Sequence, residues 1–253
     1  MPVKKKRKIV VGNWKMNVVD VAEAKRVMTA TKTAGSKLKN TDVVACPPFV
    51  FFGSLKASPK VALGAQDVYF EERGSHTGEV SVPMLLSVAA SHVIIGHCER
   101  RKMGETDAVV AEKVAAALKG GLTAVVCVGE NVRDTQGDYL GFLREQIKGS
   151  FAKVQKKMLS ALVVAYEPVW AIGAAEAMTA NDVHETTIFI KKTLSDMFGQ
   201  DEALKIPILY GGAVNFRNAQ DIIVGGEVDG LLVGRESVNP PGFAELLKAV
   251  DAI

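Results

Sequence analysis

Eight short apolar runs, each followed by a segment with helical periodicity, alternate along this 253-residue sequence. Apolar, β-branched runs without polar alternation indicate strands that are buried on both faces, as in a parallel sheet. Eight strand-and-helix units predict either a closed (β/α)₈ barrel or a large doubly wound sheet. The pattern predicts strands over 9–11, 43–46, 61–65, 93–95, 123–128, 162–166, 206–210 and 230–233, and helices over 18–33, 82–90, 108–118, 139–158, 180–197, 216–224 and 241–250, with a short turn over 49–57.

Polar and glycine-rich segments follow many of these strands, and their positions separate the two architectures. The first strand leads into Lys15, the fourth into His97 and the sixth into Glu167. These residues would lie close together only if the sheet closes into a barrel, because the carboxyl ends of all barrel strands lie at the same end of the barrel. No Gly-x-Gly-x-x-Gly follows the first strand, which disfavours a dinucleotide-binding sheet. We therefore expect one α/β domain, a single (β/α)₈ barrel over 1–253, with a basic N-terminal flank over 1–8.

The charge of the chain argues against nucleic acid as a partner. The formal net charge is +3, and the basic run at 4–8 alone supplies +5, so +3 minus +5 leaves −2 for the remainder. The remainder therefore lacks the excess of positive charge that is typical of proteins that bind nucleic acids. The run itself resembles a nuclear import signal, but we favour a solvated flank, because Ile9 starts a strand directly after it.

Composition also bears on location. No apolar run reaches membrane-spanning length and no signal peptide opens the chain, so we expect no membrane association. Cys46, Cys98 and Cys127 are odd in number and show no Cys-x-x-Cys spacing. They are interpreted as reduced, partly buried thiols of a cytoplasmic protein.

The most informative single stretch reads Ala-Leu-Val-Val-Ala-Tyr-Glu-Pro-Val-Trp-Ala-Ile-Gly, over residues 161–173. An apolar strand ends in one carboxylate, Glu167, and Pro168 prevents the strand from continuing. The apolar segment 170–173 could cover a site and exclude water. A fixed base under a dry cover suits proton abstraction from a weak carbon acid. The alternative is a strand end whose glutamate is merely solvated, and the spacing alone leaves both open.

Four motifs together cover essentially the whole chain: Asn-x-Lys at 13–15, Gly-His-x-Glu at 96–99, Glu-Pro-Val-Trp-Ala-Ile-Gly at 167–173 and Tyr-Gly-Gly at 210–212. In this order they resemble the triosephosphate isomerase family. The resemblance implies an aldose–ketose isomerase that interconverts D-glyceraldehyde 3-phosphate and dihydroxyacetone phosphate through an enediolate, in glycolysis and gluconeogenesis. It also implies a cytoplasmic homodimer whose chemistry needs no metal and no organic cofactor.

The resemblance assigns roles to five residues near the strand ends. Glu167 would be the base that moves the proton between adjacent carbons. His97 would hydrogen-bond the carbonyl oxygen, held neutral by the helix that starts beside it. Lys15 would place a positive charge beside the enediolate and the phosphate, and Asn13 would orient Lys15 or the substrate. Glu99 would pair either with Lys15 or with the arginines that follow it.

Phosphate binding would fall to backbone N–H groups in glycine-rich turns after the last two strands. Ala213 stands where the family frequently has a serine and Arg235 where it has a second glycine. Arg235 could reach the phosphate, or it could point outward and pair with Glu236. Cys98 stands where serine is usual, and the segment 174–178 also departs from the common pattern. The predicted phosphate-binding residues are Gly173, Gly211, Gly212, Ala213, Gly234 and Arg235.

The long polar connection over 66–79 exceeds the usual loop length. The resemblance implies that it inserts into a twin subunit and brings Thr77 near the partner subunit's Lys15. The alternative is a flap over its own barrel. Two rival functions remain: another phosphosugar isomerase on the same barrel, against which the Glu-Pro-Val-Trp motif speaks, and a catalytically silent binding protein. Decay to a silent protein would normally erase at least one of Lys15, His97 and Glu167, yet all three are present.

Overall fold

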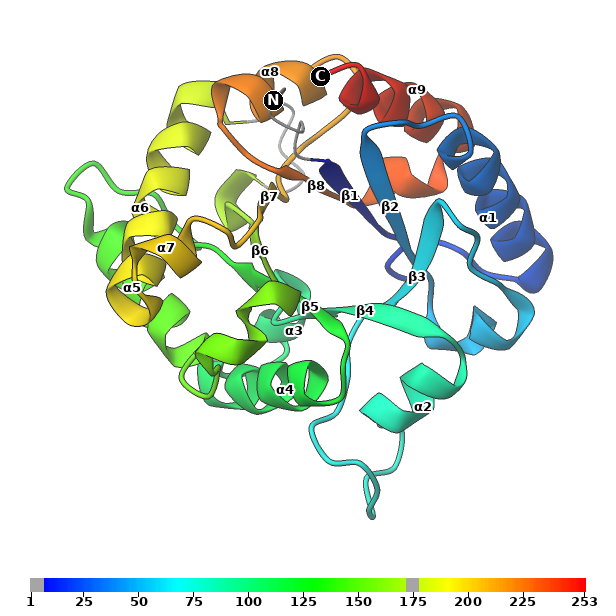
Figure 1. Ribbon diagram of the computed structural model, residues 1–253, viewed down its shortest axis with the longest axis horizontal. Coiled ribbons are helices and arrows are strands. Elements are labelled where there is room, and N and C mark those ends of the chain that lie inside the picture. Colours follow the sequence, from blue (N-terminus) through cyan, green and yellow to red (C-terminus); the bar gives the residue numbers. More distant parts are fainter. Residues whose placement is uncertain (1–6, 172–177) are drawn as a thin grey trace.

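The computed structural model describes residues 7–171 and 178–253. Its strands form one closed parallel barrel in which each strand pairs with its sequence neighbours and β1 pairs with β8. Figure 1 shows this ring of strands enclosed by a ring of helices. The predicted barrel is therefore confirmed, and the doubly wound sheet is excluded. The strands are β1 Lys8–Asn13, β2 Thr41–Cys46, β3 Val61–Ala65, β4 Ala90–Ile95, β5 Thr123–Val128, β6 Leu162–Tyr166, β7 Ile208–Tyr210 and β8 Gly230–Val233.

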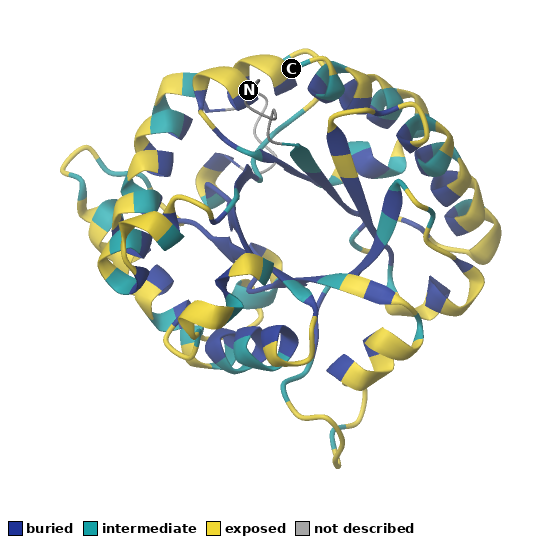
Figure 2. Cartoon of the chain, in the orientation of Figure 1, coloured by how far each residue is buried: buried dark blue, intermediate teal, exposed yellow. Residues whose placement is uncertain are grey.

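Alternating residues of each strand fill two separate apolar cores. In β1, Val10 packs toward the helices while Val11 points into the barrel, and in β6 Val164 and Val163 divide in the same way. Both faces of the strands are buried, as Figure 2 shows, which explains the continuous apolar runs. The barrel interior is packed by Val11, Val44, Cys46, Ile94, Val125, Cys127, Val163, Ala165, Leu209 and Leu232.

The helices cover the outside of the barrel. The longest, α6 Ala180–Phe198, buries one stripe of residues and exposes the other, as expected of a helix that packs on a sheet. The remaining α-helices are α1 Val21–Gly35, α2 Val82–Ser87, α3 Cys98–Lys102, α4 Asp107–Lys119, α5 Asp138–Ser150, α7 Gln200–Ala203, α8 Ala219–Gly225 and α9 Pro240–Asp251, and short 3₁₀ turns lie at η1 Phe49–Ser54, η2 Lys156–Ala161, η3 Val169–Ala171 and η4 Arg235–Val238.

Several predicted boundaries were wrong. The helix expected over 139–158 ends at Ser150, and the remainder of that segment turns and forms η2. The first helix begins at Val21 rather than 18, because Asp20 caps it by accepting from the backbone N–H of Glu23. The basic flank is also shorter than expected, since Lys8 already belongs to β1.

The connection between β3 and α2 projects from the body of the protein, as the cyan loop in Figure 1 shows. Its residues 71–75 and 77–79 are exposed. The loop carries contacts of its own: the ring of His76 lies tilted against that of Tyr69, and its Nε2 is 3.0 Å from Oε2 of Glu71. It therefore does not fold over its own barrel. Among the described helices, none combines the length and hydrophobicity needed to cross a membrane.

Candidate active site

Glu167 is the first residue after β6, and its backbone extends the strand, since its N–H donates to the carbonyl of Val128 at 2.8 Å. The side chain is 3 % exposed. One carboxylate oxygen lies 3.0 Å from Nε2 of His97, and the other accepts from the backbone N–H of Cys98 at 3.1 Å. The glutamate is thus buried and directed at another polar group, and the interpretation as a solvated strand end was wrong.

Two glycines make room for Glu167. A Cβ at Gly129 would lie 1.8 Å from the carbonyl oxygen of Glu167, and a Cβ at Gly211 would lie 2.9 Å from its Cγ. A side chain at Gly129 would clash with the backbone of Glu167, and one at Gly211 would displace its side chain. The chain after β5 and the chain after β7 can therefore pack closely against Glu167 only because the residues at 129 and 211 are glycines, which have no side chain.

His97 caps α3 at the carboxyl end of β4 and is 5 % exposed. Its Nδ1 accepts a hydrogen bond from the backbone N–H of Glu99 at 3.2 Å. A ring nitrogen that accepts a hydrogen bond carries no proton, so the proton of the neutral ring lies on Nε2. That proton is directed at the carboxylate of Glu167.

Opposing effects act on the charge of this pair. Burial lowers the pKa of His97, but the neighbouring Glu167 carboxylate outweighs it and raises the pKa to about 10. Burial likewise raises the pKa of Glu167, yet the contact with His97 and the Cys98 N–H lower it overall. In this arrangement the glutamate is ionised, and its contact favours protonation of the imidazole. The expectation that His97 works as the neutral imidazole stays a prediction.

Lys15 follows β1 and is held in an unusual backbone conformation, with φ at +51°. A non-glycine residue in this region is strained and needs support from its surroundings. Asn13 supplies part of it by accepting from the Lys15 N–H at 3.0 Å, and Gln66 donates to the Lys15 carbonyl at 3.0 Å and to that of Cys46 at 2.9 Å. Gln66 was missed in the sequence, although it directly follows β3 as Glu167 follows β6.

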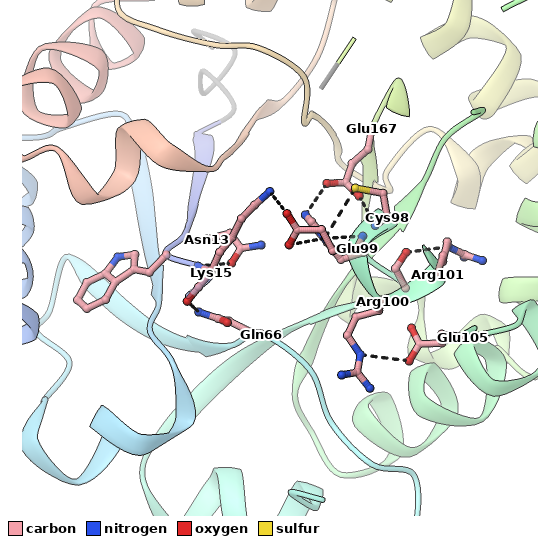
Figure 3. Close-up of polar contacts among 12 residues, drawn as sticks. Asn13, Lys15, Gln66, Cys98, Glu99, Arg100, Arg101, Glu105 and Glu167 are labelled. Atoms are coloured by element: carbon pink, nitrogen blue, oxygen red, sulfur yellow. Dashed lines mark hydrogen bonds and ion pairs between the residues drawn. The ribbon is translucent and has the colours of Figure 1, made fainter. Parts of the chain in front are cut away.

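Glu99 fixes the other end of Lys15. Its Oε1 lies 2.7 Å from Nζ of Lys15, and Figure 3 shows this contact beside Glu167. The neighbouring arginines have other partners: Arg100 lies 3.0 Å from Asp67, and Arg101 lies 2.5 Å from Asp107. Of the alternatives left open for Glu99, the structure shows the pairing with Lys15.

The residues predicted to bind phosphate differ in whether their backbone N–H already has an acceptor within the protein. Gly211 donates its N–H to the carbonyl of Tyr166 at 2.8 Å, so this group serves the barrel rather than a ligand. The N–H groups of Gly212, Ala213 and Gly234 have no acceptor among residues 7–171 and 178–253. Gly234 also lies beside Lys15, because a Cβ built there would be 3.5 Å from Lys15 Cε. Free backbone donors therefore follow β7 and β8, and the one at Gly234 lies beside Lys15.

Two further residues of the predicted phosphate site remain. Arg235 is exposed and makes no ion pair or hydrogen bond within the described part of the chain. Glu236 accepts instead from Nδ2 of Asn239 at 3.1 Å. Gly173 and the segment 174–177 lie outside the described residues.

A buried carboxylate that the sequence reasoning overlooked lies on the same face. Glu130, two residues after β5, is 1 % exposed. It accepts hydrogen bonds at 2.8 Å from the hydroxyl of Tyr166 and from Nε1 of Trp170. Trp170 begins the apolar segment 170–173, and the contact with Glu130 ties this first residue to the barrel. An acid just past a strand end was the available signal, as it was for Glu167.

One cluster near the site could hold a metal ion. His97, Cys98 and Glu167 each offer a donor atom, and the three atoms lie within 4.8 Å of one another. A cavity of about 350 Å³ adjoins this cluster, and Cys98, Cys127 and Glu167 contribute to its lining.

Comparison with known proteins places this geometry in a family. The model of the triosephosphate isomerase family matches residues 8–250. The chain belongs to the triosephosphate isomerase family. It is 37 % identical to the triosephosphate isomerase of Dehalococcoides mccartyi over 245 residues, which cover 95 % of this chain and 96 % of the relative. The triosephosphate isomerases of Moorella thermoacetica and Rhodopirellula baltica are 38 % and 39 % identical, and each match covers 96 % of this chain and 98 % of the relative.

Family membership establishes the reaction. The protein is an isomerase that interconverts D-glyceraldehyde 3-phosphate and dihydroxyacetone phosphate, a step of glycolysis, and its substrate is a triose phosphate. The rival interpretations as a different phosphosugar isomerase or a silent binding protein are therefore set aside.

Proposed function

We propose that Glu167, His97 and Lys15 carry out the isomerisation. The observation that carries this proposal is the direct contact between two buried groups, the Glu167 carboxylate and His97 Nε2, 3.0 Å apart at the carboxyl ends of β6 and β4. One group accepts a proton and the other donates a hydrogen bond, which is the pair needed to convert a carbonyl and its neighbouring C–H into an enediolate.

In the proposed reaction the substrate separates the two side chains. Glu167 removes the proton from the carbon next to the carbonyl, and His97 donates a hydrogen bond from Nε2 to the oxygen that becomes negative. Once Glu167 leaves the imidazole, the contact that raises the pKa of His97 is lost, while burial and the Glu99 N–H donated to Nδ1 remain. Both remaining effects favour the neutral ring, which is the form we assign to the reaction.

Lys15 stabilises the negative charge of the enediolate and the phosphate, and its strained backbone supports that role. Asn13 and Gln66 fix the main chain of Lys15, and Glu99 fixes its ammonium group, so the charge is in place before the substrate arrives. Preorganised charge needs no rearrangement in the transition state. We assign Asn13 and Glu99 as positioning residues that act through Lys15.

For the phosphate group we propose the free N–H groups of Gly212, Ala213 and Gly234 as donors, with Arg235 as an additional cation. The exposed guanidinium follows Gly234 directly and could form a bidentate contact with a dianion. Gly211 serves here as space for Glu167 rather than as a donor. Gly173, which lies outside the described residues, completes the predicted set.

We further propose that the protein is a cytoplasmic homodimer. The connection at 66–79 includes the loop that projects from the barrel in Figure 2, and its Thr77 is exposed. Several large apolar side chains on α2, on η1 and on the turns after β1 and α3 are also exposed, which is the property of a surface that a partner covers. These side chains are Met16, Val50, Met84, Leu86 and Met103. Three buried, unpaired cysteines fit a reducing compartment.

The catalytic assignment is tested by replacing His97 with asparagine, with His184→Asn as a matched control on the outer helix α6. An assay coupled to the conversion of glyceraldehyde 3-phosphate should show kcat reduced about 10²–10⁴-fold for His97→Asn, the range typical of a lost acid–base group. The control should stay within about twofold of the parent enzyme, since His184 is half-buried on the outer helix and makes no contact with the Glu167–His97 pair in the described part of the chain. Equal activity of both variants would refute the assignment.

A further inference from the structure

His97, Cys98 and Glu167 form a compact group of nitrogen, sulfur and oxygen donors inside the protein. All three residues are buried, and one donor atom from each lies within 4.8 Å of the others. His97 Nε2 is 3.0 Å from Glu167 Oε1. Figure 3 shows the sulfur of Cys98 beside the carboxylate of Glu167. The reaction described above uses the histidine and the glutamate but assigns no role to this thiol.

The combination of imidazole, thiolate and carboxylate is a ligand set that Zn²⁺ prefers in proteins. Three protein ligands leave a fourth position of the tetrahedron open. Here the adjoining cavity of about 350 Å³ is partly open to solvent and offers room for a water molecule, and the thiol of Cys127 also lies beside Glu167. Mg²⁺ and Ca²⁺ prefer oxygen ligands only, so a site with a buried sulfur discriminates against them.

We propose that His97, Cys98 and Glu167 form a binding site for a thiophilic divalent cation of the Zn²⁺ class. The bound ion holds Glu167 and His97 together, so the substrate cannot enter between them. Reversible inhibition of the isomerase is the functional consequence. That consequence rests on the catalytic roles proposed above, whereas the binding of the ion does not.

The proton balance of binding can be stated for each ligand. The Glu167 carboxylate is already ionised, and the Cys98 thiol loses its proton to solvent. His97 binds in its neutral form through Nε2, with its remaining proton on Nδ1, where the carboxylate of Glu99 is 3.6 Å away and the hydrogen bond from the Glu99 N–H is given up. One proton leaves from Cys98 for each ion bound, and a second leaves from His97 where the ring starts as the cation, so binding weakens as the pH falls.

The first experiment titrates isomerase activity with ZnCl₂ and compares the parent protein with Cys98→Ser. The matched control is Cys46→Ser, which changes another buried thiol, in the barrel interior on β2. Each protein is normalised to its own activity in the presence of chelator. We expect inhibition that chelator reverses, a half-inhibitory concentration at least about tenfold higher for Cys98→Ser, and a control that follows the parent. Mg²⁺ at the same concentrations should not inhibit.

The second experiment observes binding without activity. Co²⁺ replaces Zn²⁺, and a thiolate ligand gives an absorption band in the near ultraviolet. We expect one equivalent of the band in the parent and in Cys46→Ser, and its loss in both Cys98→Ser and Cys98→Ala. A cobalt band without inhibition would support the metal site and refute the catalytic roles. A band of equal strength in the Cys98 variants, or equal inhibition by Mg²⁺, would overturn the metal site.

Discussion

Shortening Glu167 by one methylene tests the proposed base most directly. Glu167→Asp keeps the charge but withdraws the carboxylate by about one C–C bond, roughly 1.5 Å. The present contacts are 3.0 Å to His97 Nε2 and 3.1 Å to the Cys98 N–H, so the shift equals about half of either distance. Close packing against Gly129 and Gly211 keeps the backbone from following the side chain.

The expected loss follows from that displacement. Misplacing a reacting group by about 1 Å costs on the order of 10²-fold, and a general base contributes about 10²–10⁴-fold in total. We therefore expect kcat to fall about 10²–10⁴-fold, a rise of about 3–5 kcal/mol in the activation barrier. KM should stay within about tenfold, because the phosphate contacts that we propose follow β7 and β8 and do not involve Glu167.

The measurement is a steady-state assay of both directions, coupled to the oxidation or formation of a reduced nicotinamide cofactor. A substrate deuterated at the carbon that loses its proton should give a larger isotope effect in Glu167→Asp, since proton transfer becomes rate-limiting. Glu185→Asp, an exposed glutamate on α6, is the matched control. A Glu167→Asp enzyme with near-normal kcat would refute the reasoning, as would a large rise in KM at unchanged kcat.

Three further outcomes follow from the same geometry. Glu167→Gln removes the charge that raises the pKa of His97 to about 10, so titration of labelled imidazole nitrogens by NMR should show that pKa several units lower; a pKa still near 10 would mean that another group sets it. Deleting residues 75–78 should produce monomers of much reduced activity, whereas sedimentation of the parent as a fully active monomer at micromolar concentration would contradict the dimer. Ala213→Ser adds a hydroxyl donor near the free N–H groups and should lower KM by roughly tenfold, equivalent to about 1.5 kcal/mol, with no change in the isotope effect on proton transfer.

The sequence determined the barrel because each strand leaves a local signature. Runs such as those at 123–128 and 162–166 are apolar on both faces, and the structure reproduces both ranges without change. Polar residues directly after strands marked the catalytic face, because the carboxyl ends of parallel strands must share one end of a closed barrel. Glu167, His97 and Lys15 became candidates in this way, and the four motifs in their order indicated the family, which the comparisons confirm.

Element ends were less predictable, because they depend on single hydrogen bonds. The first helix starts where Asp20 can cap it, although Asn17 offers the same chemistry three residues earlier. Asn17 donates instead to the carbonyl of Trp14 at 2.8 Å. Which of two suitable residues becomes the cap is decided by the path of the preceding turn, and that path depends on contacts far away in the sequence.

Only the tertiary structure decided which polar groups contact each other. Glu99 could pair with any of three cations, and ring closure brings Lys15 to it across 84 residues of sequence. The side chain of Gln66 donates to the carbonyl of Lys15 and so supports its strained backbone. The N–H of Gly211 donates to the carbonyl of Tyr166 within the barrel and is not free for a ligand. A sequence pattern predicts whether a residue is buried and toward which face of its own strand its side chain points. The choice of partner depends on the register around the whole barrel, which no single segment contains.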